Sequence, residues 1–127
     1  MLFVGVDIIE IHRIAEAKDK WGERFLKRIY TDAELDVCRD RVPALAVRFA
    51  AKEAVMKALG TGTTGVGWRE IEVLPNPDGK PLVYLYGGAH RRAEELGMAM
   101  IDLSLSHSRE FAVASAVGGA FEASHSQ

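Results

Sequence analysis

The start of the chain alternates between aliphatic residues and others, which predicts a β-strand over residues 2–9. Every second residue from Leu2 to Ile8 is aliphatic, so these side chains share one face of the strand. Asp7 lies on the opposite face, within an otherwise apolar segment. Because a buried carboxylate is costly unless another group pairs with it, Asp7 needs a partner from elsewhere in the chain.

Helical spacing and helix-terminal residues then predict a run of helices. Thr31 and Glu34 match a capping box, while Pro43 is placed for the first turn of a helix and Gly60 for the position just past its end. The predicted helices cover residues 10–29 with a break at Gly22, residues 31–39, and residues 43–59, which form the longest unbroken helix.

The second half of the chain favours strands. The segment GTGTTGVG (60–67) indicates a loop, and PNPDG (75–79) indicates a turn between two strands. Strands are predicted over 69–74, 80–86, 99–106 and 110–117, a short helix over 89–96, and a loose tail over 118–127. This order predicts a single α+β domain, residues 1–127, in which a long helix packs on a mostly antiparallel sheet.

Composition limits the class of protein. The 127 residues suffice for one domain, and a formal net charge of −2 gives no global basic field that would favour nucleic acid. The apolar stretches are too short for a membrane span, and the first ten residues do not resemble a signal peptide. Cys38 has no partner for an internal disulfide, which favours a reducing compartment and so the cytoplasm.

Charge is less even near the N-terminus. Between positions 13 and 28 the chain has six basic residues and three acidic ones. This excess fits either an acidic partner or an ordinary solvated helix face with ion pairs one turn apart, and charge alone does not decide between them.

Asp7, Glu53, Lys57 and His107 are the residues best suited to chemistry. Glu53 and Lys57 share a face of the longest predicted helix, and two carboxylates with a nearby lysine are the groups that Mg2+ and a phosphate would need. Each residue also has an ordinary explanation, such as an exposed ion pair, a helix cap or a histidine at a strand end. Spacing alone does not show that Asp7 and Glu53 meet.

Two segments resemble the signature motifs of the phosphopantetheinyl transferases. GVDIIEIHRI (5–14) is similar to the G-x-D motif near the N-terminus of that family, and RFAAKEAVMKALGTG (48–62) is similar to its K-E-x-x-x-K helix. Three supporting motifs follow in the family's order: WREIEV (68–73), DGKP (78–81) and SLSHS (104–108). The short chain resembles the small holo-acyl-carrier-protein synthase branch, and the resemblance covers residues 2–117.

The resemblance implies a function and a set of site residues. The family moves the 4′-phosphopantetheine group of coenzyme A onto a serine of apo-acyl carrier protein, with Mg2+ and release of 3′,5′-ADP, for fatty acid and lipid biosynthesis. Asp7 and Glu53 would be the Mg2+ ligands, and with Lys57 they would be the catalytic set. The implied coenzyme contacts are Arg48, Lys57, Gly60, Thr61, Lys80 and His107. The implied carrier-docking residues are Arg13, Arg24, Phe25 and Arg28. The resemblance also implies a homotrimer with active sites at the subunit interfaces.

Several points stay open at the level of the sequence. The first candidate for the group that accepts the serine proton is Glu53, or a water that Glu53 orients. Glu34, Asp36 and a metal-bound water are the alternatives. The native carrier belongs to fatty acid synthesis or to a specialised polyketide or peptide pathway. A catalytically silent coenzyme A-binding module and a trimeric scaffold without activity are alternatives of another class, although Asp7, Glu53 and Lys57 together argue against the silent module.

Overall fold

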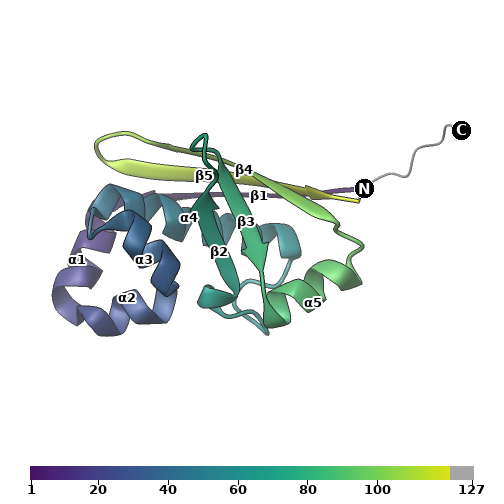
Figure 1. The fold of residues 1–127 in the computed structure, drawn as a ribbon, viewed down its shortest axis with the longest axis horizontal. Coiled ribbons are helices and arrows are strands. Elements are labelled where there is room, and N and C mark those ends of the chain that lie inside the picture. The colour runs from purple at the N-terminus through teal and green to yellow at the C-terminus, as the bar shows by residue number, and fades with distance from the viewer. Residues whose placement is uncertain (121–127) are drawn as a thin grey trace, which may run out of the picture.

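A computed structural model describes residues 1–120 and confirms the predicted α+β architecture (Figure 1). The predicted break at Gly22 and the capping box of Thr31 with Glu34 are both present. The elements are β1 (Leu2–Glu10), α1 (Ile11–Trp21), α2 (Glu23–Ile29), α3 (Asp32–Cys38), α4 (Val42–Leu59), the 3-10 turn η1 (Trp68–Glu70), β2 (Ile71–Pro75), β3 (Pro81–Leu85), α5 (Gly87–Glu95), β4 (Met100–His107) and β5 (Phe111–Gly119).

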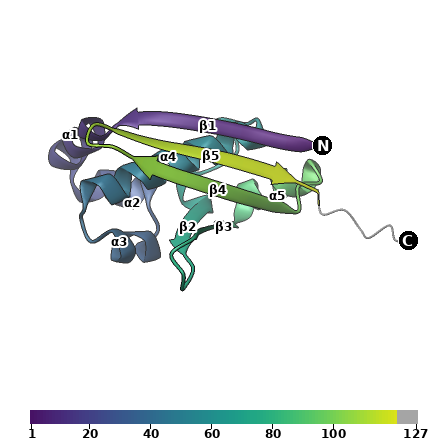
Figure 2. The ribbon, with the colours of Figure 1, turned by 90° about the horizontal axis from the view of Figure 1, so that it is seen from above.

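The strands form two antiparallel sheets where the sequence predicted one. β5 lies between β1 and β4 in a three-stranded sheet, as Figure 2 shows, and β2 pairs only with β3. The predicted tail also begins too early, because Gly118 and Gly119 still belong to β5 and pair with β1. The rest of that predicted tail, residues 121–127, lies outside the described residues.

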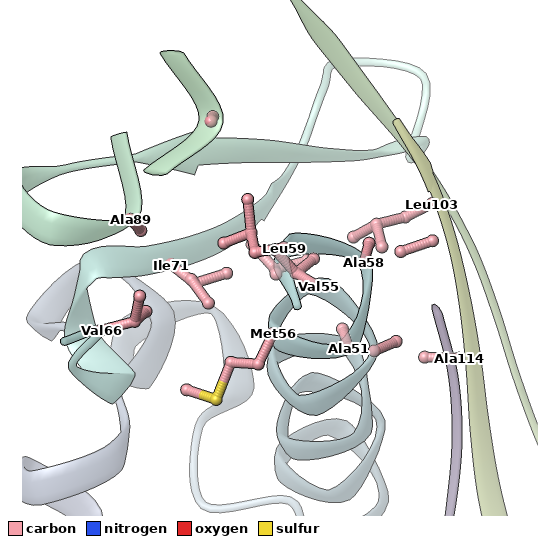
Figure 3. Close-up of a cluster of buried hydrophobic side chains, with 14 of the residues drawn as sticks. Ala51, Val55, Met56, Ala58, Leu59, Val66, Ile71, Ala89, Leu103 and Ala114 are labelled. Atoms are coloured by element: carbon pink, nitrogen blue, oxygen red, sulfur yellow. The ribbon is translucent and has the colours of Figure 1, made fainter. Parts of the chain in front are cut away.

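The helix α4 forms the centre of the fold. Twelve of its 18 residues are buried, so it is a core helix with apolar contacts on several sides rather than an amphipathic surface helix. Figure 3 shows Met56 and Leu59 on the side of Ile71, whereas Ala51 lies toward Ala114 of β5. The alanines let the helix and the three-stranded sheet approach closely.

The three-stranded sheet has helices on one face only, as Figure 1 shows. On its other face, the aliphatic row that begins at Leu2 is 56–71% exposed. The predicted separation of Asp7 from this row is confirmed, since Asp7 lies on the face that packs against α4. The bare face is also where Phe111 and Val117 of β5 are exposed. Within residues 1–120, no helix is both long enough and apolar enough to cross a membrane.

Candidate active site

The site begins with the close passage of β1 over α4. A Cβ atom added to Gly5 would overlap the main-chain carbonyl of Ala54, so only glycine permits this approach. Asp7 is two residues further along β1 and therefore lies on the same face. Its side chain is only 12% exposed, and its Oδ1 lies 3.1 Å from Nζ of Lys57 on α4. The spacing of glycine and aspartate in this motif thus places a carboxylate directly against the helix.

Lys57 supplies positive charge at the rim of the site. Its Nζ donates hydrogen bonds to Oδ1 of Asp7 and to the carbonyl of Val6, at 3.1 and 2.9 Å. The side chain is nevertheless 55% exposed, so the ammonium group remains accessible to solvent and to a ligand. A phosphate oxygen is the kind of group that such a lysine attracts as a point charge.

Glu53 completes the cluster one helical turn before Lys57. Burial raises the pKa of this carboxyl above its ordinary range, and the nearby negative charge of Asp7 and a hydrogen bond between the two carboxyl groups raise it further. Lys57 acts in the opposite direction. The two acids are therefore only partly compensated by the protein itself, and a cation between them would relieve their repulsion.

This pair of carboxylates fits Mg2+. The ion prefers oxygen ligands, and it commonly binds through one or two carboxylates together with waters and phosphate oxygens. Residues 1–120 contain no group of three or more His, Cys, Asp or Glu side chains placed to hold a metal. If the pair held such an ion, Asp7 and Glu53 would supply two ligands, and the others would come from the substrate and from water.

Two pockets share walls near Glu53, and the first of them is lined by this carboxylate. The first, of about 590 Å3, extends from Glu53 past Arg13 and has mostly apolar walls. The second, of about 600 Å3, is lined by Arg24 and Arg28. Phe25 lines both pockets, and so do Ala17 and Phe49. The structure thus places all four predicted docking residues on two pockets joined at Phe25, the first of which reaches Glu53.

The basic residues of these pockets differ in their pairing. Arg13 lies 3.5 Å from Glu10 in an exposed ion pair. Arg24 and Arg28 take part in no ion pair among residues 1–120. Their charge is therefore available to an acidic partner, which favours the first of the two explanations for the basic excess in this part of the sequence.

The predicted coenzyme residues fall into two groups. Gly60 and Thr61 follow Lys57 at the end of α4, where they line a pocket of about 460 Å3 with Arg91 and Arg92. The second group is Arg48, Lys80 and His107. Arg48 lines a different pocket, of about 400 Å3, between α4, the turn after β2, and β4, while Lys80 lies in that turn and His107 at the end of β4. Within one chain the two groups do not form a single site.

The members of the second group have partners of their own. Arg48 lines the pocket and donates through Nε to the carbonyl of Val73, at 3.0 Å. Lys80 lies 2.7 Å from Asp102 on β4. His107 is exposed at the end of β4, the strand that supplies Leu105 to this pocket.

Two of the candidate proton acceptors are now placed. Glu34 is fully buried, where one carboxylate oxygen lies 2.7 Å from Nζ of Lys52 and the other accepts from the N–H of Val73. This carboxylate has no exposed surface and is not placed to receive a proton from a substrate. Asp36 is exposed on α3, apart from the carboxylate cluster.

Sequence reasoning missed several residues of these sites. Arg92 lines the pocket beside Gly60 and donates through Nε to the carbonyl of Leu59, at 2.9 Å, which holds the C-terminal end of α4. The adjacent arginines 91 and 92 on a short helix were the available signal. Lys52, the first lysine of the K-E-x-x-x-K motif, was passed over because its burial cannot be read from the motif.

Comparison with known proteins agrees with this geometry. A family model described as the 4′-phosphopantetheinyl transferase superfamily matches residues 3–115. The chain belongs to this superfamily. The resemblance of the two signature motifs is thereby confirmed, and the G-x-D and K-E-x-x-x-K segments of the transferase are the ones that meet at the carboxylate cluster.

Relatives of this transferase share nearly its whole length. A holo-[acyl-carrier-protein] synthase of Dehalococcoides mccartyi is 56% identical over 117 residues, which cover 92% of this chain and 98% of the relative. The crystal structure of the Neisseria meningitidis holo-[acyl-carrier-protein] synthase has a TM-score of 0.85 at 36% identity, covering 92% of this chain and 97% of that one. The Helicobacter pylori synthase, solved in complex with coenzyme A, has a TM-score of 0.84 at 29% identity, covering 91% and 99%.

Proposed function

We propose that this chain is a holo-[acyl-carrier-protein] synthase, which transfers 4′-phosphopantetheine from coenzyme A to a serine of apo-acyl carrier protein. The observation that supports this most directly is the meeting of Asp7, Glu53 and Lys57, with Glu53 on a pocket that shares Phe25 with the pocket of Arg24 and Arg28. The three relatives described above carry the same enzyme name over nearly the full chain length, and one was solved with coenzyme A.

The proposed reaction is a phosphoryl-type transfer. The serine oxygen forms a bond to the β-phosphorus of coenzyme A, and the bond from that phosphorus to the oxygen bridging the two phosphates breaks, which releases 3′,5′-ADP. Mg2+ held by Asp7 and Glu53 would supply charge neutralisation at the pyrophosphate. Lys57 contacts a phosphate oxygen through its accessible ammonium group. Positioning and electrostatic stabilisation would provide most of the rate enhancement.

The serine proton goes to the carboxylate of Glu53 or to a water that this carboxylate orients. Without a bound cation, burial and the neighbouring Asp7 raise the pKa of Glu53. A bound Mg2+ would act in the opposite direction, so in the metal-bound enzyme a water oriented by this carboxylate is the favoured proton acceptor.

An acidic carrier protein would dock on α1 and α2. Arg24 and Arg28 offer positive charge that no acidic side chain of residues 1–120 pairs with, and Phe25 gives an apolar contact between the two pockets. Complementary charge of this kind speeds encounter and fixes the register of the two proteins. Because the pocket continues to Glu53, a carrier serine bound here would lie near the carboxylates.

We also propose that the enzyme is a cytoplasmic homotrimer with active sites at its subunit interfaces. The bare aliphatic face of the three-stranded sheet is the kind of exposed apolar patch that marks association. A neighbouring subunit would also complete the divided coenzyme site by bringing its Arg48, Lys80 and His107 to Lys57 and Gly60. Sedimentation equilibrium tests the state, since a particle of one 13.9 kDa chain would contradict it. The unpaired, buried Cys38 favours a reducing location.

Intact-protein mass spectrometry tests the function. Apo-acyl carrier protein incubated with this protein, coenzyme A and Mg2+ should gain the mass of one phosphopantetheine group. A chelator and the substitution Asp7→Ala should each abolish the gain, and Glu53→Gln should lower turnover at least about a hundredfold, as expected on loss of a charge-stabilising group. Glu16→Gln on the exposed side of α1 is the matched control and should have no effect.

The contrary outcomes point to the alternatives. Binding of coenzyme A without mass gain for any of several carriers would indicate the silent binding module. A gain restricted to a polyketide or peptide carrier would indicate a specialised pathway. An unchanged rate for Glu53→Gln at saturating Mg2+ would remove this residue from the ligand set.

A further inference from the structure

A second charged cluster lies on the side of α4 that faces β2. Nζ of Lys52 lies 2.7 Å from Oε1 of Glu34 on α3, and both side chains are fully buried. The same ammonium group donates to the carbonyls of Trp68 and Ile71. Among residues 1–120, no other ion pair has both side chains buried.

The remaining groups of this cluster are also satisfied. Oε1 of Glu34 accepts from the N–H of Thr31 at 2.9 Å, and Oε2 accepts from the N–H of Val73 at 2.7 Å. Arg48, one turn before Lys52 on α4, donates to the carbonyl of Val73. The edge of β2 that does not pair with β3 is thus bound by charged side chains from α3 and α4.

These contacts fix the rotation of α4 about its axis. Lys52 binds three elements at once: α3 through Glu34, the turn η1 through Trp68, and β2 through Ile71. Glu53 is the next residue, and successive residues of an α-helix point about 100° apart. A helix held at Lys52 therefore directs Glu53 to a defined position against β1.

We propose that the buried pair of Lys52 and Glu34 positions Glu53 against Asp7, so that the two carboxylates are held ready for a divalent cation. The inference rests on the proposed function of the carboxylate site. Lys52 and Glu34 are positioning residues, since they lie on another side of α4 and their hydrogen bonds and ion pair involve neither carboxylate ligand. Catalytic constellations need their groups held within about 0.5 Å and 10–20° of the productive geometry, and a rotated α4 exceeds that limit.

The pair is poorly suited to a purely stabilising role. Removing two charges from water costs free energy that their attraction does not always recover, and apolar replacements of such pairs are often neutral or stabilising. A buried pair with several directional hydrogen bonds does, however, select one arrangement of the elements it joins. The two lysines of the K-E-x-x-x-K motif then have different roles: Lys52 fixes the position of α4, whereas Lys57 lies at the rim of the site.

Manganese binding tests this role separately from turnover. Mn2+ replaces Mg2+ as a spectroscopic probe, and the titration follows the loss of the free-ion electron paramagnetic resonance signal with coenzyme A present. The double variant Lys52→Met with Glu34→Gln removes both charges, while the glutamine keeps an acceptor for the N–H of Val73. We expect a folded protein whose dissociation constant for Mn2+ rises at least tenfold and whose kcat falls, with KM for the carrier unchanged.

The control variant separates positioning from stability. Met98→Ala removes a buried apolar side chain that packs beside Gly118 of β5 and is not among the residues that bind Lys52. It should lower the melting temperature without changing the Mn2+ affinity or kcat. If the double variant is folded and binds Mn2+ as tightly as the wild type, or if Met98→Ala weakens Mn2+ binding equally, the positioning role is wrong.

A second variant tests the proposal if the double variant does not fold. Glu34→Asp keeps the charge and shortens the side chain by one methylene group, which draws Lys52 out of its place. It should weaken Mn2+ binding in the same direction, and an unchanged affinity in this folded variant would overturn the proposal. Failure of the proposed function is distinguishable, since the wild type would then bind Mn2+ without transferring phosphopantetheine to any carrier.

Discussion

Charged side chains on the two sides of α4 differ in whether the protein itself pairs them with opposite charge. On the side of β2, Lys52 and Glu34 are fully buried and paired with each other. On the side of β1, Glu53 lies beside Asp7, another acid, and only the half-exposed Lys57 opposes their charge. Residues 52 and 53 are neighbours in one motif, yet one is satisfied by the protein and the other is not.

This difference separates structural charge from functional charge. A buried charge whose hydrogen bonds are all made within the chain needs no ligand, and it orders the elements that it joins. A carboxylate whose pKa is raised by a like neighbour is held in an unfavourable place, and such sites are functional candidates because a ligand can relieve them. The comparison therefore predicts opposite responses when each charge is removed.

The largest expected effect is on the buried side. Lys52→Met should lower the free energy of unfolding by about 3–5 kcal/mol, because it leaves the carboxylate of Glu34 buried without its cation. Lys27→Met is the matched control, since Lys27 pairs with Glu23 in an exposed i,i+4 arrangement worth about 0.3–0.5 kcal/mol. Urea denaturation measures both. A loss below about 1 kcal/mol for Lys52→Met would show that the carboxylate of Glu34 does not depend on Lys52 for its stability. The comparison of the two sides of α4 would then fail.

Local signals predicted most of the fold. The alternation in β1, the capping box at Thr31, and the proline and glycine that flank α4 each act over a few residues, and each was confirmed. The separation into two sheets was not predictable in this way. It depends on β3 and β4, which lie near each other without pairing. The opposite edge of β2 is likewise without a strand, since the N–H and carbonyl groups of Val73 are bound by Glu34 and Arg48.

The site was predictable only in part for the same reason. The sequence identified Asp7 and Glu53 as candidates, but 46 positions separate them, and only the packing of β1 on α4 shows that they meet. The role of Gly5 follows from that packing, since its missing side chain allows the close approach. The division of the implied coenzyme contacts into two groups could not be predicted from the sequence either. Arg48 and Lys57 both belong to α4, but Arg48 lines a pocket beside β4 whereas Lys57 contacts β1.

The next largest expected effect concerns Arg24 and Arg28 on the proposed carrier-docking surface. Reversing Arg24 and Arg28 to glutamate should raise KM for the carrier about tenfold or more, with kcat and coenzyme A affinity unchanged, because complementary charge acts on encounter and docking. Lys20→Glu with Lys27→Glu makes the same change in net charge at residues that do not line the pockets beside Glu53. Steady-state kinetics at two salt concentrations compare the pairs.

Equal effects of the two double variants would mean that overall charge, rather than this surface, governs carrier binding. A fall in coenzyme A affinity for the Arg24 and Arg28 variant would instead place these residues in the coenzyme site, and the docking assignment would be wrong.

The smallest expected effect has the opposite sign from that of Lys52→Met. Because the pKa of Glu53 is raised on folding, the folded protein binds more protons than the unfolded chain between the ordinary carboxyl pKa of about 4.3 and the raised value. Linkage then lowers the wild-type stability as pH rises through this window. Glu53→Gln has no proton to lose, so without divalent cations it should match the wild type near pH 4 and become the more stable protein as pH rises, with the difference constant above the raised pKa.

Urea denaturation from pH 4 to pH 8 in the presence of a chelator measures this difference. Glu16→Gln is the control, because Glu16 is exposed on α1, and its difference from the wild type should not depend on pH in this way. Added Mg2+ with coenzyme A should stabilise the wild type more than Glu53→Gln, since a ligand stabilises the state that binds it. If Glu53→Gln is instead less stable than the wild type at pH 7, the carboxylate is satisfied within the chain as Glu34 is, and the two sides of α4 do not differ in the way proposed.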